Sequence, residues 1–189
     1  MGVFEYVSVL TSIIVGLGIA HLLRGVAGLI QHPGRHKSDW IHLLWVGFMF
    51  FQAIFWWWWE FAFESLEGWT FQLYLFVLLY ATLIYLLCAL LFPSDLEGYA
   101  GYEGYFMSRR RWFFGIMTMY FLADFLDTWL KGAEYFASLG LEYPITSSLY
   151  IVGSVIGMLT MNRRYHAAFA LIAFVYQIEW AFRSYSTIG

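Results

Sequence analysis

Acidic residues lie inside or at the ends of long apolar stretches of this chain, where a charged side chain is hard to accommodate. Asp124 and Asp127 are three residues apart, so both carboxyl groups fall on one face of a helix. An ionised group at bilayer depth costs several kcal/mol and normally faces a partner, a bundle interior or a wet cavity. Carboxyl groups placed close together in such a setting are natural sites for a proton or a cation. The acids concerned are Glu5, Glu60, Asp124, Asp127 and Glu179.

Polar residues accompany these acids at helical spacing. Tyr176, Glu179 and Arg183 recur at intervals of three and four residues, and Gln52 shares a helix face with Glu60. At a rise of about 1.5 Å per residue, the acids of the fourth and sixth apolar stretches lie at matching depths, about 18–20 Å from the cytoplasmic ends of their helices. We therefore expect four helices to converge on one outward-facing polar pocket. Its predicted lining is Glu5, Gln52, Glu60, Asp124, Asp127, Tyr176, Glu179 and Arg183.

Three kinds of function are compatible with these residues. The acids outnumber the nearby bases, Lys131 and Arg183, which favours binding or transport of a proton, a cation or a small cationic solute. In one alternative, Lys131 merely pairs with Asp127. Arg183 likewise pairs with Glu179, and the protein is a structural or accessory subunit of a larger membrane complex. In the other alternative, it is a membrane enzyme or a protein that binds a quinone, a lipid or haem.

The composition is that of an integral membrane protein. Of 189 residues, 61% are hydrophobic and only 12% are charged, and the mean hydropathy is +0.65. Ordinary soluble domains have about a quarter of their residues charged. At roughly 20 apolar residues per spanning helix, the chain has room for about six or seven spans in a single domain. At this length we expect no separate catalytic domain outside the membrane.

Six apolar stretches predict an all-α transmembrane bundle, because barrel strands would alternate polar and apolar residues. The first stretch is not typical of a cleavable signal peptide, since Glu5 stands where a basic residue is usual. The longest connection, residues 93–111, is rich in Tyr, Gly and Arg. It is predicted to be a cytoplasmic loop that either lies at the lipid headgroups or docks a partner. The predicted spans are 4–30, 40–63, 70–92, 112–130, 144–161 and 166–185.

The basic residues predict how the chain is oriented. Eight of the ten Lys and Arg residues fall in alternate connections, leaving only Lys131 and Arg183 on the opposite side. Short loops rich in Lys and Arg stay in the cytoplasm, so both termini are expected on the outer side of a bacterial-type inner membrane. This topology accounts for the basic residues without nucleic-acid binding. The run Trp56–Trp59 is expected to form part of an aromatic belt at the membrane interface.

His21 is the one histidine deep inside an apolar stretch, and it shares a stripe with Gly18, Gly25 and Gly28. These glycines would let a second helix approach closely, so His21 is expected to make an inter-helix hydrogen bond. A role as a metal or haem ligand is a weaker alternative, because a bis-histidine haem needs a second deep histidine. No cofactor is therefore predicted, and bound membrane lipid is expected.

Two segments are candidates for helix packing between or within copies of the chain. Gly153 and Gly157 form a small-residue motif that permits close helix contact, either inside the chain or in a homo-oligomer. The stretch 70–92 carries no charge and mostly large apolar side chains. We therefore expect this stretch to form a peripheral helix that faces lipid or another subunit.

Overall fold

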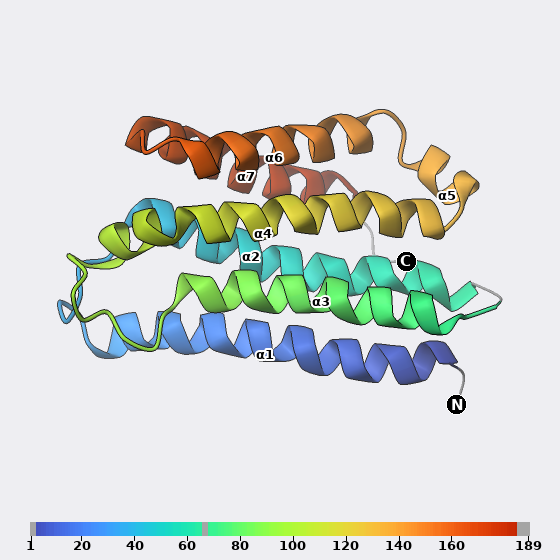
Figure 1. Ribbon diagram of the computed structural model, residues 1–189, viewed down its shortest axis with the longest axis horizontal. Coiled ribbons are helices and arrows are strands. Elements are labelled where there is room, and N and C mark those ends of the chain that lie inside the picture. The colour runs from blue at the N-terminus through green and yellow to red at the C-terminus, as the bar shows by residue number, and fades with distance from the viewer. Residues whose placement is uncertain (1–2, 66–67, 185–189) are drawn as a thin grey trace.

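The chain folds into a bundle of helices. The computed structural model describes residues 3–65 and 68–184, and within them it contains seven α-helices, one 3₁₀ segment and no strand. Figure 1 shows the long helices running along the longest axis of the molecule. The predicted all-α class is confirmed. The elements are α1 (Val3–Gln31), α2 (Trp40–Trp59), η1 (Glu60–Ser65), α3 (Phe71–Leu91), α4 (Tyr102–Leu130), α5 (Ala133–Ser138), α6 (Glu142–Leu159) and α7 (Arg163–Ser184).

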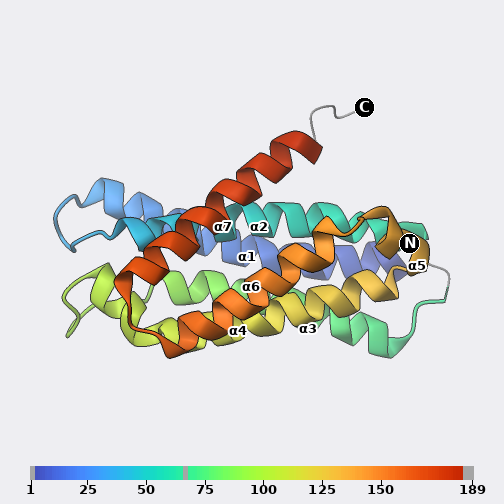
Figure 2. The same ribbon diagram turned by 90° about the horizontal axis from the view of Figure 1, so that it is seen from above.

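The helices form a core layer with a looser pair on top. Helix α3 packs between α1 and α4, while α2 lies behind them and contacts α1, α3 and α7 (Figure 1). Helix α6 packs along α4. Helix α7 crosses α2 obliquely, and its C-terminal half diverges from the bundle in Figure 2. The space between α2, α4, α6 and α7 therefore widens toward the end of the bundle that carries α5.

Side-chain caps fix the starts of α2 and α3. Asp39 accepts a hydrogen bond from the backbone N–H of His42 at 3.1 Å, and Thr70 accepts one from that of Leu73 at 3.2 Å. Each cap satisfies one of the amide groups that the first turn of a helix leaves without an intrahelical partner. Both helices accordingly begin within a residue of the predicted stretches.

In the part of the chain that the structure describes, four helical segments are long and apolar enough to cross a membrane: α1, α2 with most of η1, α3 and α4. Helices α6 and α7 correspond to the fifth and sixth predicted stretches, but they are not among these four. The first turns of α6 contain Glu142 and several hydroxyl side chains, and α7 carries basic residues at its start and Glu179 and Arg183 toward its end. The structure thus supports four of the six predicted spans, and the other two stay predictions.

Helix α4 begins ten residues before the predicted stretch at 112, so the connection from 93 is a loop only as far as Gly101. Gly101 has φ +113°, and a Cβ there would lie 2.7 Å from the carbonyl oxygen of Lys37. That carbonyl accepts a hydrogen bond from the N–H of Tyr102. The first three turns of α4 are polar but unbroken by proline. Hydropathy therefore located the apolar part of the helix and not its start.

Two histidines bind the carbonyl groups at the end of α3. His21 Nε2 lies 2.7 Å from the carbonyl oxygen of Phe92, and His42 Nε2 lies 2.6 Å from that of Leu91. A carbonyl oxygen only accepts, so each ring donates from Nε2. The last carbonyls of a helix lack intrahelical donors, and these two rings supply them. The predicted inter-helix hydrogen bond of His21 is confirmed.

Two of the three glycines that share the His21 stripe lie against α3 or the residue that follows it. A Cβ at Gly18 would lie 3.4 Å from the Cys88 sulfur, and a Cβ at Gly25 would lie 2.2 Å from the Phe92 ring. Gly28 has open space around it. The close contact between α1 and α3 therefore depends on Gly25 above all.

We expect Gly25→Ala to lower the free energy of unfolding by about 1–3 kcal/mol, because the base of the Phe92 ring must move to admit a methyl group. Gly16→Ala on the same helix meets no atom within 4 Å and is the matched control. It should leave stability unchanged or raise it by up to about 1 kcal/mol through helix propensity. Unfolding in mixed micelles measures both. Equal stability of the two variants would contradict the close packing.

Both candidate packing segments contact other helices of the same chain. A Cβ at Gly153 would lie 2.7 Å from the Phe169 ring, and one at Gly157 would lie 2.9 Å from the Phe114 ring. Helix α3 lies between α1 and α4 in the bundle, and its contact with lipid or another subunit stays a prediction. The least buried of the four apolar segments is α1, with 17% of its span buried against 33% for α3.

Candidate functional site

A pocket of about 140 Å³ lies between α2, α4, α6 and α7, beneath α5. Five of the eight predicted site residues line it: Gln52, Glu60, Asp124, Asp127 and Tyr176. The other three, Glu5, Glu179 and Arg183, are not among its lining residues. Aromatic side chains form much of the remaining wall, including Phe55, Trp56, Trp59, Tyr80, Phe121, Tyr135, Tyr143, Tyr150 and Trp180.

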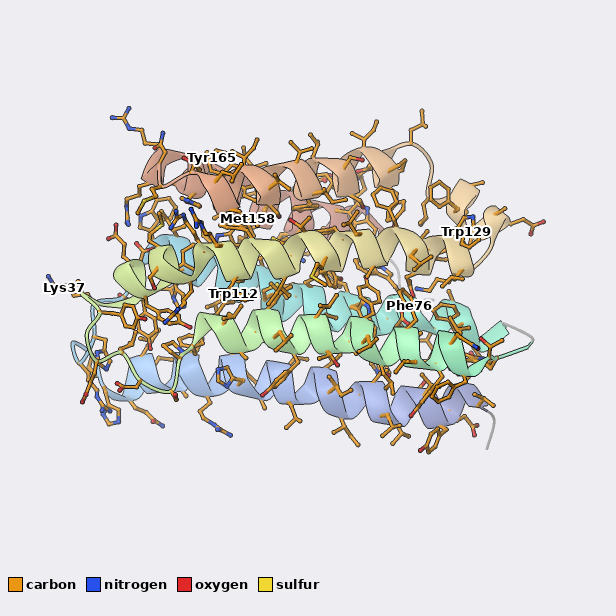
Figure 3. The ribbon with its side chains drawn as sticks, in the orientation of Figure 1. Lys37, Phe76, Trp112, Trp129, Met158 and Tyr165 are labelled. Carbon is orange, nitrogen blue, oxygen red and sulfur yellow. The ribbon has the colours of Figure 1, made fainter. Side chains whose placement is uncertain are left out.

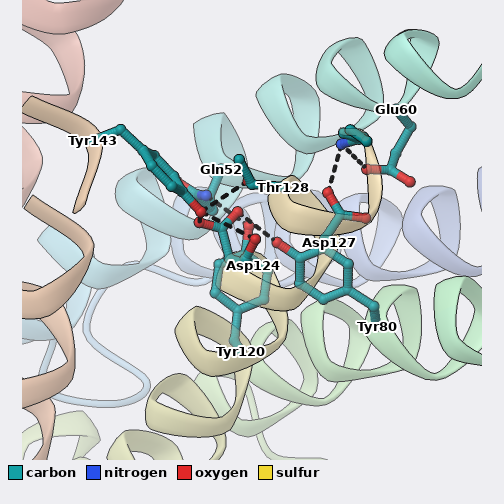
Figure 4. Close-up of polar contacts among 9 residues, drawn as sticks. Gln52, Glu60, Tyr80, Tyr120, Asp124, Asp127, Thr128 and Tyr143 are labelled. Atoms are coloured by element: carbon teal, nitrogen blue, oxygen red, sulfur yellow. Dashed lines mark hydrogen bonds and ion pairs between the residues drawn. The ribbon is translucent and has the colours of Figure 1, made fainter. Parts of the chain in front are cut away.

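Lys131 joins two of the carboxyl groups (Figure 4). Its Nζ lies 2.9 Å from Glu60 Oε1 and 2.5 Å from Asp127 Oδ2. The ammonium group also lies 4.9 Å from the centre of the Phe63 ring and 5.7 Å from that of Tyr135, within the range of cation–π attraction. The lysine side chain is only 2% exposed. Burial by itself would lower the pKa of Lys131, but the carboxylates of Asp127 and Glu60 raise it above its ordinary value.

Glu60 and Asp127 keep one carboxyl oxygen each without a hydrogen-bond partner. These atoms, Glu60 Oε2 and Asp127 Oδ1, are fully buried. The two residues are 8% and 2% exposed, so bulk water does not reach them freely. A buried polar atom with no partner is costly. A proton, a water molecule or a donor group on a bound solute would satisfy these oxygens.

Asp124 is held by hydroxyl groups (Figure 4). Tyr80 donates to its Oδ1 at 2.9 Å, and Tyr143 donates to its Oδ2 at 2.8 Å. Thr128 in turn donates to the Tyr143 oxygen at 2.8 Å. Among the described residues, no Lys or Arg forms an ion pair with Asp124. Its direct contacts are therefore hydroxyl groups, whereas Asp127 contacts an ammonium group.

Two glutamines close the deep end of the pocket. Gln52 donates from its side-chain nitrogen to the Tyr120 hydroxyl at 2.7 Å, and its side-chain oxygen lies 2.7 Å from the side-chain amide of Gln177. Gln177 comes from α7 and is 5% exposed. These contacts tie α2, α4 and α7 together beneath the carboxyl groups. Gln52 thus has a structural partner on each side.

The edge of the pocket between α6 and α7 carries a second, exposed group of charges. Arg183 pairs with Glu142, and its Nε lies 3.1 Å from Glu179 Oε1. Tyr176 donates to Glu142 Oε1 at 2.8 Å. Hydrogen bonds from Arg183 and Tyr176 lower the pKa of Glu142. The Glu179 side chain is 55% exposed, so its predicted place among the buried acids is wrong.

Glu5 lies on α1, which packs against α2 and α3 on the side of the bundle away from α6 and α7 (Figure 1). Near it on the same helix, Ser12 accepts a hydrogen bond from the indole N–H of Trp57 at 2.7 Å. The expectation that α1 contributes to the pocket is therefore wrong. Tyr80 of α3 lines the pocket, and no residue of α1 is among its lining residues.

The run of four tryptophans does not form a single belt. Trp57 and Trp58 are 40% and 48% exposed, as a belt requires, but Trp56 is 1% exposed. Trp56 and Trp59 both line the pocket. The helix turns by about 100° per residue, so four consecutive side chains face in different directions. Only the middle pair, Trp57 and Trp58, is exposed as the predicted belt requires.

Several residues that line the pocket were not predicted from the sequence. Tyr80, Tyr143 and Gln177 are the main ones, and Lys131 was assigned to Asp127 alone. A buried tyrosine usually places its hydroxyl on a partner, so a tyrosine in the charge-free α3 was a usable signal. Tyr143 lies one residue before the predicted fifth span and gave no such signal.

The geometry of the described residues does not indicate a metal site. Within residues 3–65 and 68–184, no group of three or more His, Cys, Asp or Glu side chains is arranged to hold a metal ion. Comparison with known proteins adds no function: no protein-family model, curated protein or solved structure matches the chain.

Proposed function

We propose that the pocket binds a proton, a cation or a small cationic solute and passes it across a membrane. The observation that carries this proposal is Asp124, a pocket carboxyl group that forms no ion pair with any described Lys or Arg. Beside it, Glu60 and Asp127 share the single ammonium group of Lys131. At neutral pH, three ionised carboxyl groups and one lysine would leave an excess of two negative charges. A bound cation or proton removes part of that excess.

The size and the walls of the pocket limit what it holds. A volume of about 140 Å³ is close to that of an engineered protein cavity that takes up benzene. Aromatic rings offer negative faces that attract cations, and carboxylates supply the charge. These features favour a small monovalent solute over a large or anionic one.

The proposed setting is a bacterial-type inner membrane that the chain crosses six times, with both termini on the outer side. Helices α6 and α7 contain 18 and 22 residues, which is within the range of about 17–25 residues for a spanning helix. The uneven distribution of Lys and Arg supports the orientation. Figure 3 shows Lys37 and Trp129 at opposite ends of the bundle, so the pocket lies toward the end that this topology places outside.

A non-catalytic accessory role is the second candidate. It is supported by the two ion pairs it requires, Lys131 with Asp127 and Arg183 with Glu179. It leaves Asp124 unexplained, because a purely structural carboxyl group at this depth would be expected to meet a base or to be replaced by an amide. The proposal of cation binding accounts for Asp124 as well.

The test is a flux and binding assay with Asp124→Asn in proteoliposomes, with protons, sodium and methylammonium as probes. Loss of one partner of a buried charge pair costs about 2–5 kcal/mol, so binding should weaken by about thirtyfold or more and flux should fall to that of empty liposomes. Asp95→Asn changes an exposed loop carboxyl group in the same way and should transport normally. If wild-type protein binds and carries none of the probes, the proposed function is wrong.

A further inference from the structure

Lys131 occupies a site that is built to hold an ammonium group. We propose that the ligand of the pocket is a small primary monoamine whose ammonium group pairs with Asp124, and that Lys131 fills a second ammonium subsite and so excludes diamines. This inference rests on the proposed function and names its substrate class. Lys131 is then a specificity-determining residue as well as a structural one.

The Lys131 subsite combines carboxylate groups with aromatic rings. Its ammonium group meets Glu60 and Asp127, and the rings of Phe63 and Tyr135 lie close by. Two carboxylates and two aromatic faces around one buried ammonium group are the contacts that a free alkylammonium ion would require. The protein thus shows, with its own side chain, how the pocket holds an amine.

Asp124 likewise offers a carboxylate beside aromatic side chains. Each of its oxygens accepts one tyrosine hydroxyl, from Tyr80 and from Tyr143. A carboxylate has about four acceptor positions, so capacity remains for the N–H groups of an ammonium ion. The same tyrosines add aromatic faces to the wall. Asp124 is only partly buried and lines the pocket, so a solute in the pocket can reach it.

The two carboxyl groups that hold Lys131 each have an oxygen without a hydrogen-bond partner among the described residues. Glu60 Oε2 and Asp127 Oδ1 are buried without partners, although Lys131 already holds the other oxygen of each carboxyl group. The pocket therefore retains acceptors and negative charge after its own lysine is counted. A single additional ammonium group reduces that charge without meeting Lys131.

A ligand with two ammonium groups would place the second one close to Lys131. Asp124 and Asp127 are three residues apart on α4, which places their Cβ atoms about 5–6 Å apart. The two ends of a short diamine would span such a separation. Its second end would then lie beside Lys131, and two like charges at close range in a buried site repel strongly. Removing the lysine charge should turn the pair of subsites into a diamine site.

The experiment compares butylamine with 1,4-diaminobutane, using wild-type and variant protein in nanodiscs and equilibrium dialysis of radiolabelled amines. Wild-type protein should bind butylamine more tightly than the diamine. Lys131→Met should shift the preference toward the diamine by about tenfold or more, because a like charge is removed and Glu60 and Asp127 lose their own ammonium partner. Lys37→Met, which removes the other lysine of the chain at the far end of the bundle, should leave the preference unchanged.

A second variant covers the case in which Lys131→Met does not fold. Lys131→Met combined with Asp127→Asn removes the base together with one of its acids, and it keeps Glu60 as the anion of the second subsite. It should show the same shift. If butylamine binds and neither variant gains the diamine, the inference is wrong while the proposed function stands. The same holds if the wild-type pocket binds protons or sodium but no amine. If no probe binds at all, both fail.

Discussion

We expect Lys131→Met to lower the free energy of unfolding by about 3–5 kcal/mol, the usual cost of removing one partner from a buried ion pair. The methionine keeps most of the side-chain volume, so lost packing contributes little. What remains is two carboxyl groups, on Glu60 and Asp127, whose oxygens are buried and have lost their common ammonium partner. Reversible unfolding in mixed micelles at neutral pH measures the change.

Two further variants separate this charge effect from a loss of contacts. Lys37→Met removes an exposed loop lysine and should change stability by no more than about 0.5 kcal/mol. The triple variant Lys131→Met, Asp127→Asn, Glu60→Gln removes all three charges. Replacing a whole buried ionic group by neutral residues is often close to neutral, so most of the lost stability should return. If the triple variant is no more stable than Lys131→Met, the lysine acts through packing.

The elements of the fold were largely predictable because apolar runs in this chain coincide with helices. The stretches 40–63 and 70–92 match α2 with η1 and α3 closely, since Asp39 and Thr70 cap the helices where the apolar residues begin. The start of α4 was not predictable in this way. Its first turns are rich in Tyr and Arg, and hydropathy reports the preference for an apolar surrounding, not the backbone conformation.

The site was predictable in part, because periodicity places residues on a common face but does not say where that face points. Asp124 and Asp127 were expected together and do line one pocket with Glu60 of α2. Tyr176 and Glu179 were also placed on one face, yet only Tyr176 lines the pocket. Helix α7 diverges from the bundle (Figure 2), and in its last turns Trp180 still lines the pocket while Glu179 and Arg183 lie at the exposed edge.

The equal depth expected for the acids of the fourth and sixth stretches stays a prediction. It assumed that every helix runs parallel to the membrane normal, so that equal residue counts give equal depths. Helix α7 crosses α2 obliquely, and Glu179 is 55% exposed where Asp127 is 2% exposed. A tilt of this kind follows from side-chain packing between helices, such as the rings around Trp45, and no single stretch of sequence contains it.

The aromatic cluster around Trp45 sets the position of α7 against α2 and α4. The Trp45 ring centre lies 5.3–5.5 Å from the ring centres of four phenylalanines, and its side chain is completely buried. Phe169 among them belongs to α7, which also supplies pocket residues such as Tyr176 and Gln177. The four rings are those of Phe48, Phe113, Phe114 and Phe169.

We expect Trp45→Ala to cost about 3–5 kcal/mol of unfolding free energy, the range for removing a large buried aromatic side chain. The control is Trp112→Ala on α4, which deletes the same side chain at a position 67% exposed and should cost far less. Unfolding in mixed micelles measures both variants. Because lipid tails are as apolar as the core, transfer from lipid into the bundle gains little, and the difference between the variants measures packing. If the two losses are equal, the ring cluster does not hold α7, and the pocket wall supplied by α7 must be fixed by its polar contacts with Gln52 and Glu142 instead.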